Sequence, residues 1–137
     1  MLKLIGEKSG IEIEVLDYQD PSAECRDDRN WLNCNVRAHI GCVRLEVDCM
    51  IQTYDVRYLY EGLQGTSESF VWSFPEDDIS IEFGMKNGVL SIAKFRYRKE
   101  SSEEGIAVSF NLLKLGRTRK ELLESVCDTM MQYPVLD

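Results

Sequence analysis

Glu12 and Glu14 are the residues of this chain whose type and spacing come nearest to acid and base chemistry. They are separated by one residue, so on a strand both carboxylates lie on the same face. Glycosidases use carboxylate pairs of this kind as acid and base. Ile11, Ile13 and Val15 alternate with the two glutamates, and this alternation is typical of a sheet with one face in solvent. We therefore interpret the pair as a solvated face.

Nucleophilic and metal chemistry has little support in the sequence. His39 is the only histidine, which excludes a metal site built from paired histidines. Cys34 could act as a nucleophile beside it, but residues five apart on one strand lie on opposite faces. The cysteines are odd in number and form no C-x-x-C pair, which indicates reduced thiols. GMKNG matches no phosphate-binding loop. The sequence thus predicts no catalytic residue, no metal and no cofactor.

Two acidic stretches are compatible either with a solvated surface or with a docking surface for a basic partner. The first, YQDPSAECRDDRNWL at 18–32, is a turn-prone loop that leads into Trp31, and its carboxylates are Asp20, Glu24, Asp27 and Asp28. The second stretch is Glu76, Asp77 and Asp78. A net charge of -8 disfavours nucleic acid and anionic membranes as partners. It favours a basic protein or solubility alone.

A basic stripe opposes this trend locally. Phe95 and Tyr97 alternate with cationic residues, a pattern that can stack bases and neutralise phosphates; the cations are Lys94, Arg96, Arg98 and Lys99. Because the whole chain is acidic, we interpret the stripe as the outer face of a strand.

The length of 137 residues fits one domain, 1–137, with a respectable core. The start MLKLIGEKSG is too short in apolar residues for a secretory signal, and no later stretch approaches the roughly 18 apolar residues that span a bilayer. We expect a cytoplasmic protein. The sequence does not indicate an oligomeric state.

Alternating apolar residues predict strands at 11–15, at 69–74, at 79–83, after Asn87-Gly88 and at 106–113, with a hairpin over 30–50 that turns at His39-Ile40-Gly41. Thr53 is predicted to cap an internal helix with Val56, Leu59, Tyr60 and Leu63 on one face and Gly62 or Gly65 at its end. Thr118 and Glu121 form a capping box for a C-terminal helix. The fold class is α+β, mainly β: an antiparallel sheet or a partly open barrel or sandwich of about seven strands with these two helices.

The order of several motifs resembles the WapI-type immunity proteins of bacteria over nearly the whole chain. The most specific is Asp28-x-Asn30-Trp31-Leu32, which follows an Ile-x-Ile-x-Val-Leu-x-Tyr strand at 11–18 and Pro21. The later motifs are Thr53-x-x-Val56-x-x-Leu59, Phe74-Pro75-Glu76 before the strand at 79–83, and a closing helix rich in Glu and Leu.

The resemblance implies a small cytoplasmic protein, not an enzyme, that binds and neutralises the C-terminal domain of a wall-associated, contact-dependent toxin, often a nuclease. The partner would be that cognate, basic toxin domain, and an acidic antagonist can steer toward it. The candidate contacts are Asp20, Glu24, Asp27, Asp28, Glu76, Asp77 and Asp78, and Trp31 would anchor the loop to the core. The alternative is a small ligand-binding or regulatory β-domain with Trp72 and Tyr97 lining its cavity.

Overall fold

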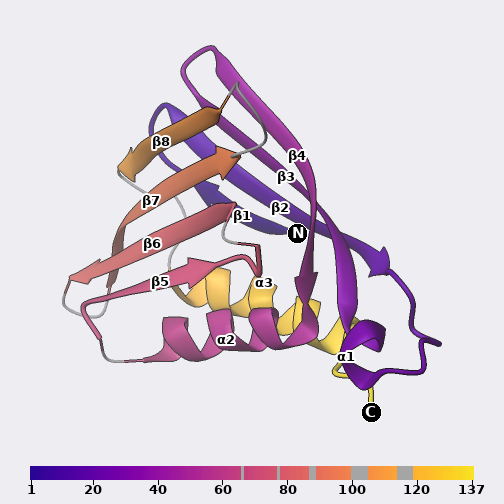
Figure 1. Ribbon diagram of the computed structural model, residues 1–137. Helices are drawn as coiled ribbons and strands as arrows, with labels where there is room; N and C mark the ends of the chain where they lie inside the picture. The colour runs from indigo at the N-terminus through magenta and orange to yellow at the C-terminus, as the bar shows by residue number, and fades with distance from the viewer. Residues whose placement is uncertain (66, 77, 87–88, 100–104, 114–118) are drawn as a thin grey trace.

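The residues that the structure describes form two four-stranded antiparallel sheets with helices across one end (Figure 1). The computed structural model describes residues 1–65, 67–76, 78–86, 89–99, 105–113 and 119–137. The first sheet contains β1 (Leu2–Ile5), β2 (Ser9–Tyr18), β3 (Trp31–Ile40) and β4 (Val43–Gln52), in that order. The second contains β5 (Ser69–Ser73), β6 (Ile79–Lys86), β7 (Val89–Lys99) and β8 (Ile106–Leu113). The predicted mainly-β α+β fold is confirmed, as an open pair of sheets.

The described residues also form helices α1 (Arg26–Arg29), α2 (Thr53–Gln64) and α3 (Arg119–Gln132). Figure 1 shows α2 and α3 side by side beneath the two sheets, while α1 is a short turn near the C-terminus. None of the helices in these ranges is long and apolar enough to cross a membrane.

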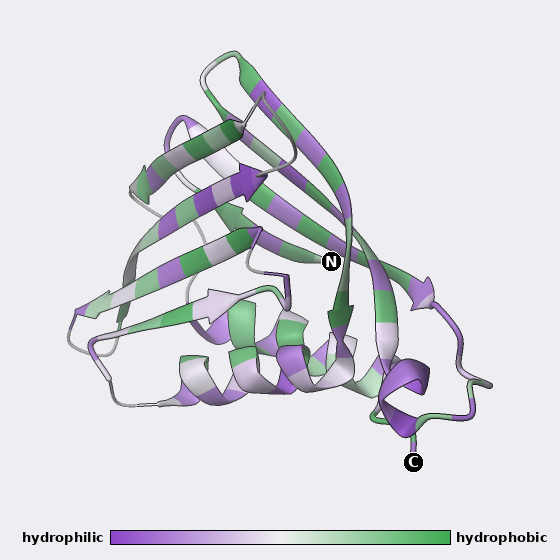
Figure 2. Ribbon diagram, in the orientation of Figure 1, coloured by the Kyte–Doolittle hydropathy of each residue, from purple (hydrophilic) through white to green (hydrophobic). Residues whose placement is uncertain are grey.

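The core lies between the sheets and above the two long helices. Figure 2 shows the alternation of hydrophobic and hydrophilic residues along the strands that produces it. On β3 the core face is Leu32, Cys34, Val36 and Ala38, all nearly inaccessible to solvent, as predicted from the period of two. Trp72, Phe83 and Phe95 of the second sheet and Leu59, Leu63, Leu122 and Val126 of the helices complete the core. Burying a side chain of this size stabilises the fold by about 1.5–3 kcal/mol.

Helix α2 follows its predicted stripe, but its N-cap differs from the prediction. Gln52 is the N-cap, and its backbone N–H donates to the Asp55 carboxylate at 2.7 Å. Thr53 is the first residue of the helix, and its hydroxyl donates to the side-chain oxygen of Asn30 at 2.9 Å. The helix ends at Gln64, with Gly65 as its C-cap. Gly62 lies inside the helix, where a Cβ would lie 2.5 Å from the Phe70 ring, so glycine permits this close packing.

The β3–β4 hairpin is confirmed, but its turn lies further along the chain than predicted. His39 and Ile40 still belong to β3, and Ile40 pairs with Val43 across a two-residue turn. Gly41 has a φ of 57°, a left-handed conformation that glycine adopts without steric cost. The sequence prediction also missed β1, because only four residues at 2–5 form the strand.

Three predicted features lie outside the described residues: the Asn87-Gly88 turn, the Thr118 cap of the C-terminal helix, and Asp77. The flanking residues Lys86 and Val89 are paired between β6 and β7.

Candidate functional site

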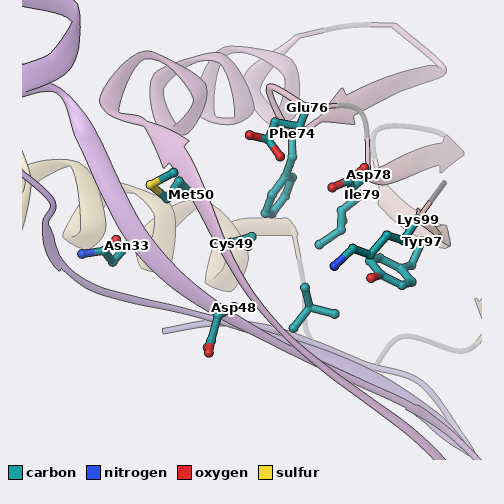
Figure 3. Close-up of a pocket in the computed structure, with 11 residues that line it drawn as sticks. Asn33, Asp48, Cys49, Met50, Phe74, Glu76, Asp78, Ile79, Tyr97 and Lys99 are labelled. Atoms are coloured by element: carbon teal, nitrogen blue, oxygen red, sulfur yellow. The ribbon is translucent and has the colours of Figure 1, made fainter. Parts of the chain in front are cut away.

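An open cleft of about 350 Å³ lies between strand β4 and the turn that joins β5 to β6 (Figure 3). Both sheets contribute to it, since β4 belongs to the first sheet and the opposite wall belongs to the second. Its lining residues are Asn33, Val47, Asp48, Cys49, Met50, Phe74, Glu76, Asp78, Ile79, Tyr97 and Lys99.

The wall formed by the second sheet is apolar and fixed by backbone hydrogen bonds. The N–H of Phe74 donates to the carbonyl of Ile79 at 2.9 Å, which closes the turn between them. The carbonyl of Asp78 accepts from the N–H of Arg98 at 2.8 Å, which ties the turn to β7. The floor of the cleft is formed by Phe74, Ile79 and Tyr97, each at least 94% buried. Because they are packed into the core, these side chains have little freedom to move.

The rim of the cleft is acidic. Its described ionisable carboxylates are Asp48, Glu76 and Asp78, against the single cation Lys99. The pKa of the Cys49 thiol is raised to about 11, first by burial and then by repulsion from these three carboxylates. The same negative potential that disfavours a thiolate favours a cation. The cleft is therefore suited to a basic group with an apolar neighbour.

The structure brings part of the second acidic stretch to this cleft. Glu76 and Asp78 both line it, and Asp48 of β4 borders it from the outer face of the first sheet, where Asn35 donates to its carboxylate. The remaining member of the stretch, Asp77, lies outside the described residues.

The first acidic stretch forms a separate surface. All four carboxylates of the loop between β2 and β3 are exposed: Asp20, Glu24, Asp27 and Asp28. None of them lines the cleft. Asp27 and Asp28 lie in α1, which is next to α2 because the Arg26 guanidinium stacks 5.9 Å from the Tyr54 ring. We call these four residues the acidic loop.

Asn30 holds the end of the acidic loop, a role that the sequence prediction did not find. Its side chain is fully buried and makes four hydrogen bonds. Its amide nitrogen donates to the carbonyls of Arg26 and Leu136, and its amide oxygen accepts from the Thr53 hydroxyl and the Leu136 N–H. One side chain thus joins the loop, the start of α2 and the C-terminal segment. Trp31, the proposed anchor, is half-buried and lies on the face of β3 that points away from the core residues Leu32 and Cys34.

The residues considered for catalysis serve in an ion pair, in the core and in the packing of β3 against β2. Glu12 and Glu14 both contact the Arg37 guanidinium, at 3.2 and 3.5 Å, on the solvent face of the first sheet. Cys34 is buried, and burial together with repulsion from Cys49 raises the pKa of its thiol to about 12. A thiol with such a pKa stays protonated at neutral pH and is a poor nucleophile. His39 lies on the opposite face of β3, against Gly10.

The residues of the alternative ligand-binding interpretation are separated in the structure. Trp72 is 1% exposed, and its indole N–H donates to the carbonyl of Asp55 at 2.9 Å. It borders a cavity of about 10 Å³ between sheets and helix, which holds a single water at most. Tyr97 instead lines the open cleft.

Three of the four cations of the basic stripe lie on the outer face of a strand, as predicted, whereas Lys99 lines the cleft. Phe95 and Tyr97 point into the core, whereas Lys94, Arg96 and Arg98 are exposed on β7. Lys94 lies opposite Glu82 of β6, so part of the stripe has an acidic neighbour across the sheet.

Comparison with known families resolves the classification. The sequence model of the immunity protein WapI-like family matches residues 1–122. This chain belongs to that family. A search of the curated proteins and of the solved structures found no match.

Proposed function

We propose that this WapI-like protein is a non-catalytic immunity protein that acts in the cytoplasm. It binds and neutralises the C-terminal toxin domain of a wall-associated, contact-dependent toxin. Membership of an immunity protein family supports a toxin partner. The observation that carries the proposal is the acidic cleft, where Glu76 and Asp78 lie beside an apolar floor and Asp48 borders the opposite side, in a chain of net charge -8.

The chemistry of such a cleft suits a basic toxin surface. A nuclease that binds the phosphates of its substrate is basic around its active site, and an acidic inhibitor is attracted to that site at long range. Charge complementarity of this kind raises the association rate and selects the partner. Contact with the apolar floor would then lower the dissociation rate, since buried apolar anchors carry most of the binding energy at interfaces.

Two surfaces are proposed as contacts. The first is the rim of the cleft, with Glu76 and Asp78 together with their neighbour Asp77. The second is the acidic loop. Glu76 and the carboxylates of the acidic loop are exposed and Asp78 is half-buried, so charge reversal at these positions leaves the core intact.

The test uses a toxin domain identified either as the C-terminal domain of a secreted repeat protein in the gene neighbourhood or by pull-down with this chain. Co-expression of the wild-type chain should restore growth to cells that produce this toxin domain. The cleft double variant, Glu76→Lys with Asp78→Lys, should slow association about tenfold or more and weaken its dependence on salt. The loop double variant, Asp27→Lys with Asp28→Lys, measures the second surface separately.

A matched control carries the same charge change elsewhere. Glu61 of α2 and Glu124 of α3 are exposed, and their reversal to lysine alters the net charge by the same amount. Glu12 is a poorer control because Arg37 binds it. If the control slows association as much as the cleft and loop variants do, only the overall charge matters. If the wild-type chain neither binds the domain nor protects the cells, the proposed function is wrong.

A further inference from the structure

Strand β4 is an edge of the first sheet, and the hydrogen bonds of its hairpin show which backbone groups face outward. The Thr53 N–H donates to the Asn30 carbonyl at 2.9 Å, so Asn30 and Thr53 form a hydrogen-bonded pair. Antiparallel strands alternate between hydrogen-bonded and non-bonded pairs. From the register, the residues of β4 that direct N–H and C=O away from β3 are Arg44, Glu46, Asp48, Met50 and Gln52.

Only the last of these outward groups has a described partner on its N–H. The Gln52 N–H is bound by the Asp55 carboxylate at the start of α2. Within the described ranges, no backbone group bonds to the outward groups of Arg44, Glu46, Asp48 or Met50. These four residues form a free edge long enough to pair with a segment of about seven residues. We call them the β4 edge.

The β4 edge borders the acidic cleft, which the other edge strands do not. Val47, Asp48, Cys49 and Met50 line the cleft from β4. The other edge of this sheet, β1, has four residues and packs against α3. Edge strand β5 has five residues and lies next to α2. None of the residues of β1, β5 or β8 lines the cleft.

We propose that an extended, basic segment of the toxin domain adds to the β4 edge as a further strand and places side chains in the acidic cleft. This inference rests on the proposed function and specifies how the partner is held. In strand addition, main-chain hydrogen bonds provide affinity and pockets for alternate side chains provide specificity. Here the β4 edge supplies the main-chain hydrogen bonds, and the cleft supplies the pocket for side chains.

The two faces of β4 define the side chains of the added strand. Successive side chains of a strand point to opposite faces, so alternate residues of the segment enter the cleft beside Val47 and Cys49. There they meet the apolar floor of Phe74, Ile79 and Tyr97, with Glu76 and Asp78 at the rim. Figure 3 shows Phe74, Ile79 and Tyr97 on the opposite side of the cleft from Cys49.

The other residues of the segment lie on the outer face, next to Glu46 and Asp48. Asn35 of β3 holds these two carboxylates by donating to both, at 3.1 and 2.9 Å. Opposite charges on neighbouring strands stabilise a sheet, whereas like charges destabilise it. The segment should therefore carry Lys or Arg on its outer face and apolar residues, with a cation near the rim, on its inner face.

Amide hydrogen exchange, followed by NMR on the full chain with the toxin domain defined above, tests the inference. In the free chain the outward amides of the β4 edge should exchange rapidly, since no described group protects them. In the complex the amides of Glu46 and Asp48 should exchange at least tenfold more slowly. The Val71 amide is the internal control. The hydrogen bonds between Phe74 and Ile79 and between Met85 and Glu68 set the pattern of pairing between β5 and β6. In this pattern the Val71 N–H points away from β6, so its exchange should not change.

Proline substitution provides an independent test through the same backbone group. Glu46→Pro removes the outward N–H, whereas Glu46→Ala removes only the side chain. Proline is tolerated on an edge strand where its missing N–H faced solvent. Glu46→Pro should raise Kd at least tenfold above that of Glu46→Ala. Val71→Pro, on the edge of β5, should bind like the wild type. Near-native circular dichroism spectra would show that the variants fold.

The outcomes separate this inference from the proposed function. If the wild type binds but the β4 amides stay unprotected, or Glu46→Pro binds as tightly as Glu46→Ala, strand addition is wrong and the immunity function stands. Protection of the β4 amides in the isolated chain that rises with its concentration would assign the edge to a second copy and overturn the inference. If the wild type does not bind the toxin domain, both proposals fall.

Discussion

Replacement of Asn30 by alanine should destabilise this protein more than any exposed polar substitution. The change removes a fully buried amide and leaves four groups without their partner: the Thr53 hydroxyl, the Leu136 N–H, and the carbonyls of Arg26 and Leu136. A typical internal hydrogen bond contributes about 1 kcal/mol net, and a buried group left unpaired costs about 1–3 kcal/mol. The Leu136 and Arg26 groups are only partly buried, so water can replace some of these bonds. We expect a loss of about 3 kcal/mol.

Urea unfolding, followed by circular dichroism and tryptophan fluorescence, measures this loss. The midpoint should fall at an unchanged m-value, because the surface exposed on unfolding is the same. Thr53→Val removes one of the four bonds and should cost about 1 kcal/mol. The double variant should cost less than the two single losses together, since both changes remove the same Asn30–Thr53 contact.

Asn33→Ala is the matched control. Asn33 lies on the exposed face of β3, three residues after Asn30, and donates to the Asp17 carboxylate at 2.7 Å. Its loss should cost less than about 1 kcal/mol. A free energy of unfolding for Asn30→Ala within 1 kcal/mol of wild type, or a similar loss for Asn33→Ala, would show that Asn30 does not join the three segments.

Three further outcomes are expected. Cys34 and Cys49 keep their thiols protonated in the folded state, because their pKa values are raised to about 12 and about 11 from an ordinary 9.0. Above pH 9 the unfolded state therefore binds fewer protons than the folded state. The free energy of unfolding should therefore fall from pH 9 to 11, by at most about 1.4 kcal/mol per pH unit for each thiol, and less steeply in Cys34→Ala; an equal slope in the variant would argue against this cause. Trp72→Ala should cost about 3–5 kcal/mol in urea unfolding and Trp31→Ala less, because Trp72 is in the core and Trp31 is partly exposed; the reverse order would make Trp31 the main anchor. Elemental analysis of the purified protein should find no stoichiometric zinc, and one zinc per chain would contradict a function by binding alone.

The strands were predictable because alternation along one strand needs no knowledge of the rest of the fold. The core face of β3 was found in this way, and so was the exposed position of Lys94, Arg96 and Arg98 on β7. Local preference failed where a distant residue decided the outcome. Threonine is a better N-cap than glutamine by preference, but Gln52 caps α2, while the buried Thr53 hydroxyl donates to Asn30, 23 residues away in the sequence.

The candidate site was predictable only in part. The acidity of 76–78 is visible in the sequence, but the position of Glu76 and Asp78 across the cleft from Cys49 depends on how the two sheets face each other. The role of Asn30 could not be read locally either, because its partners lie 23 and 106 residues away. One signal was present: a short polar residue directly before a strand, beside the large aromatic Trp31. Because a large aromatic residue is the usual anchor, this signal predicts the role for Trp31 and not for Asn30.

The most direct test of the proposed function is a titration of the toxin domain's activity with the purified chain. A non-catalytic immunity protein should abolish the activity at one chain per toxin domain. Dilution below Kd should restore it, because no covalent change has occurred. Undiminished toxin activity in a tenfold excess of the chain would contradict binding and neutralisation. Complete loss at a small fraction of an equivalent, without recovery on dilution, would contradict the non-catalytic mechanism.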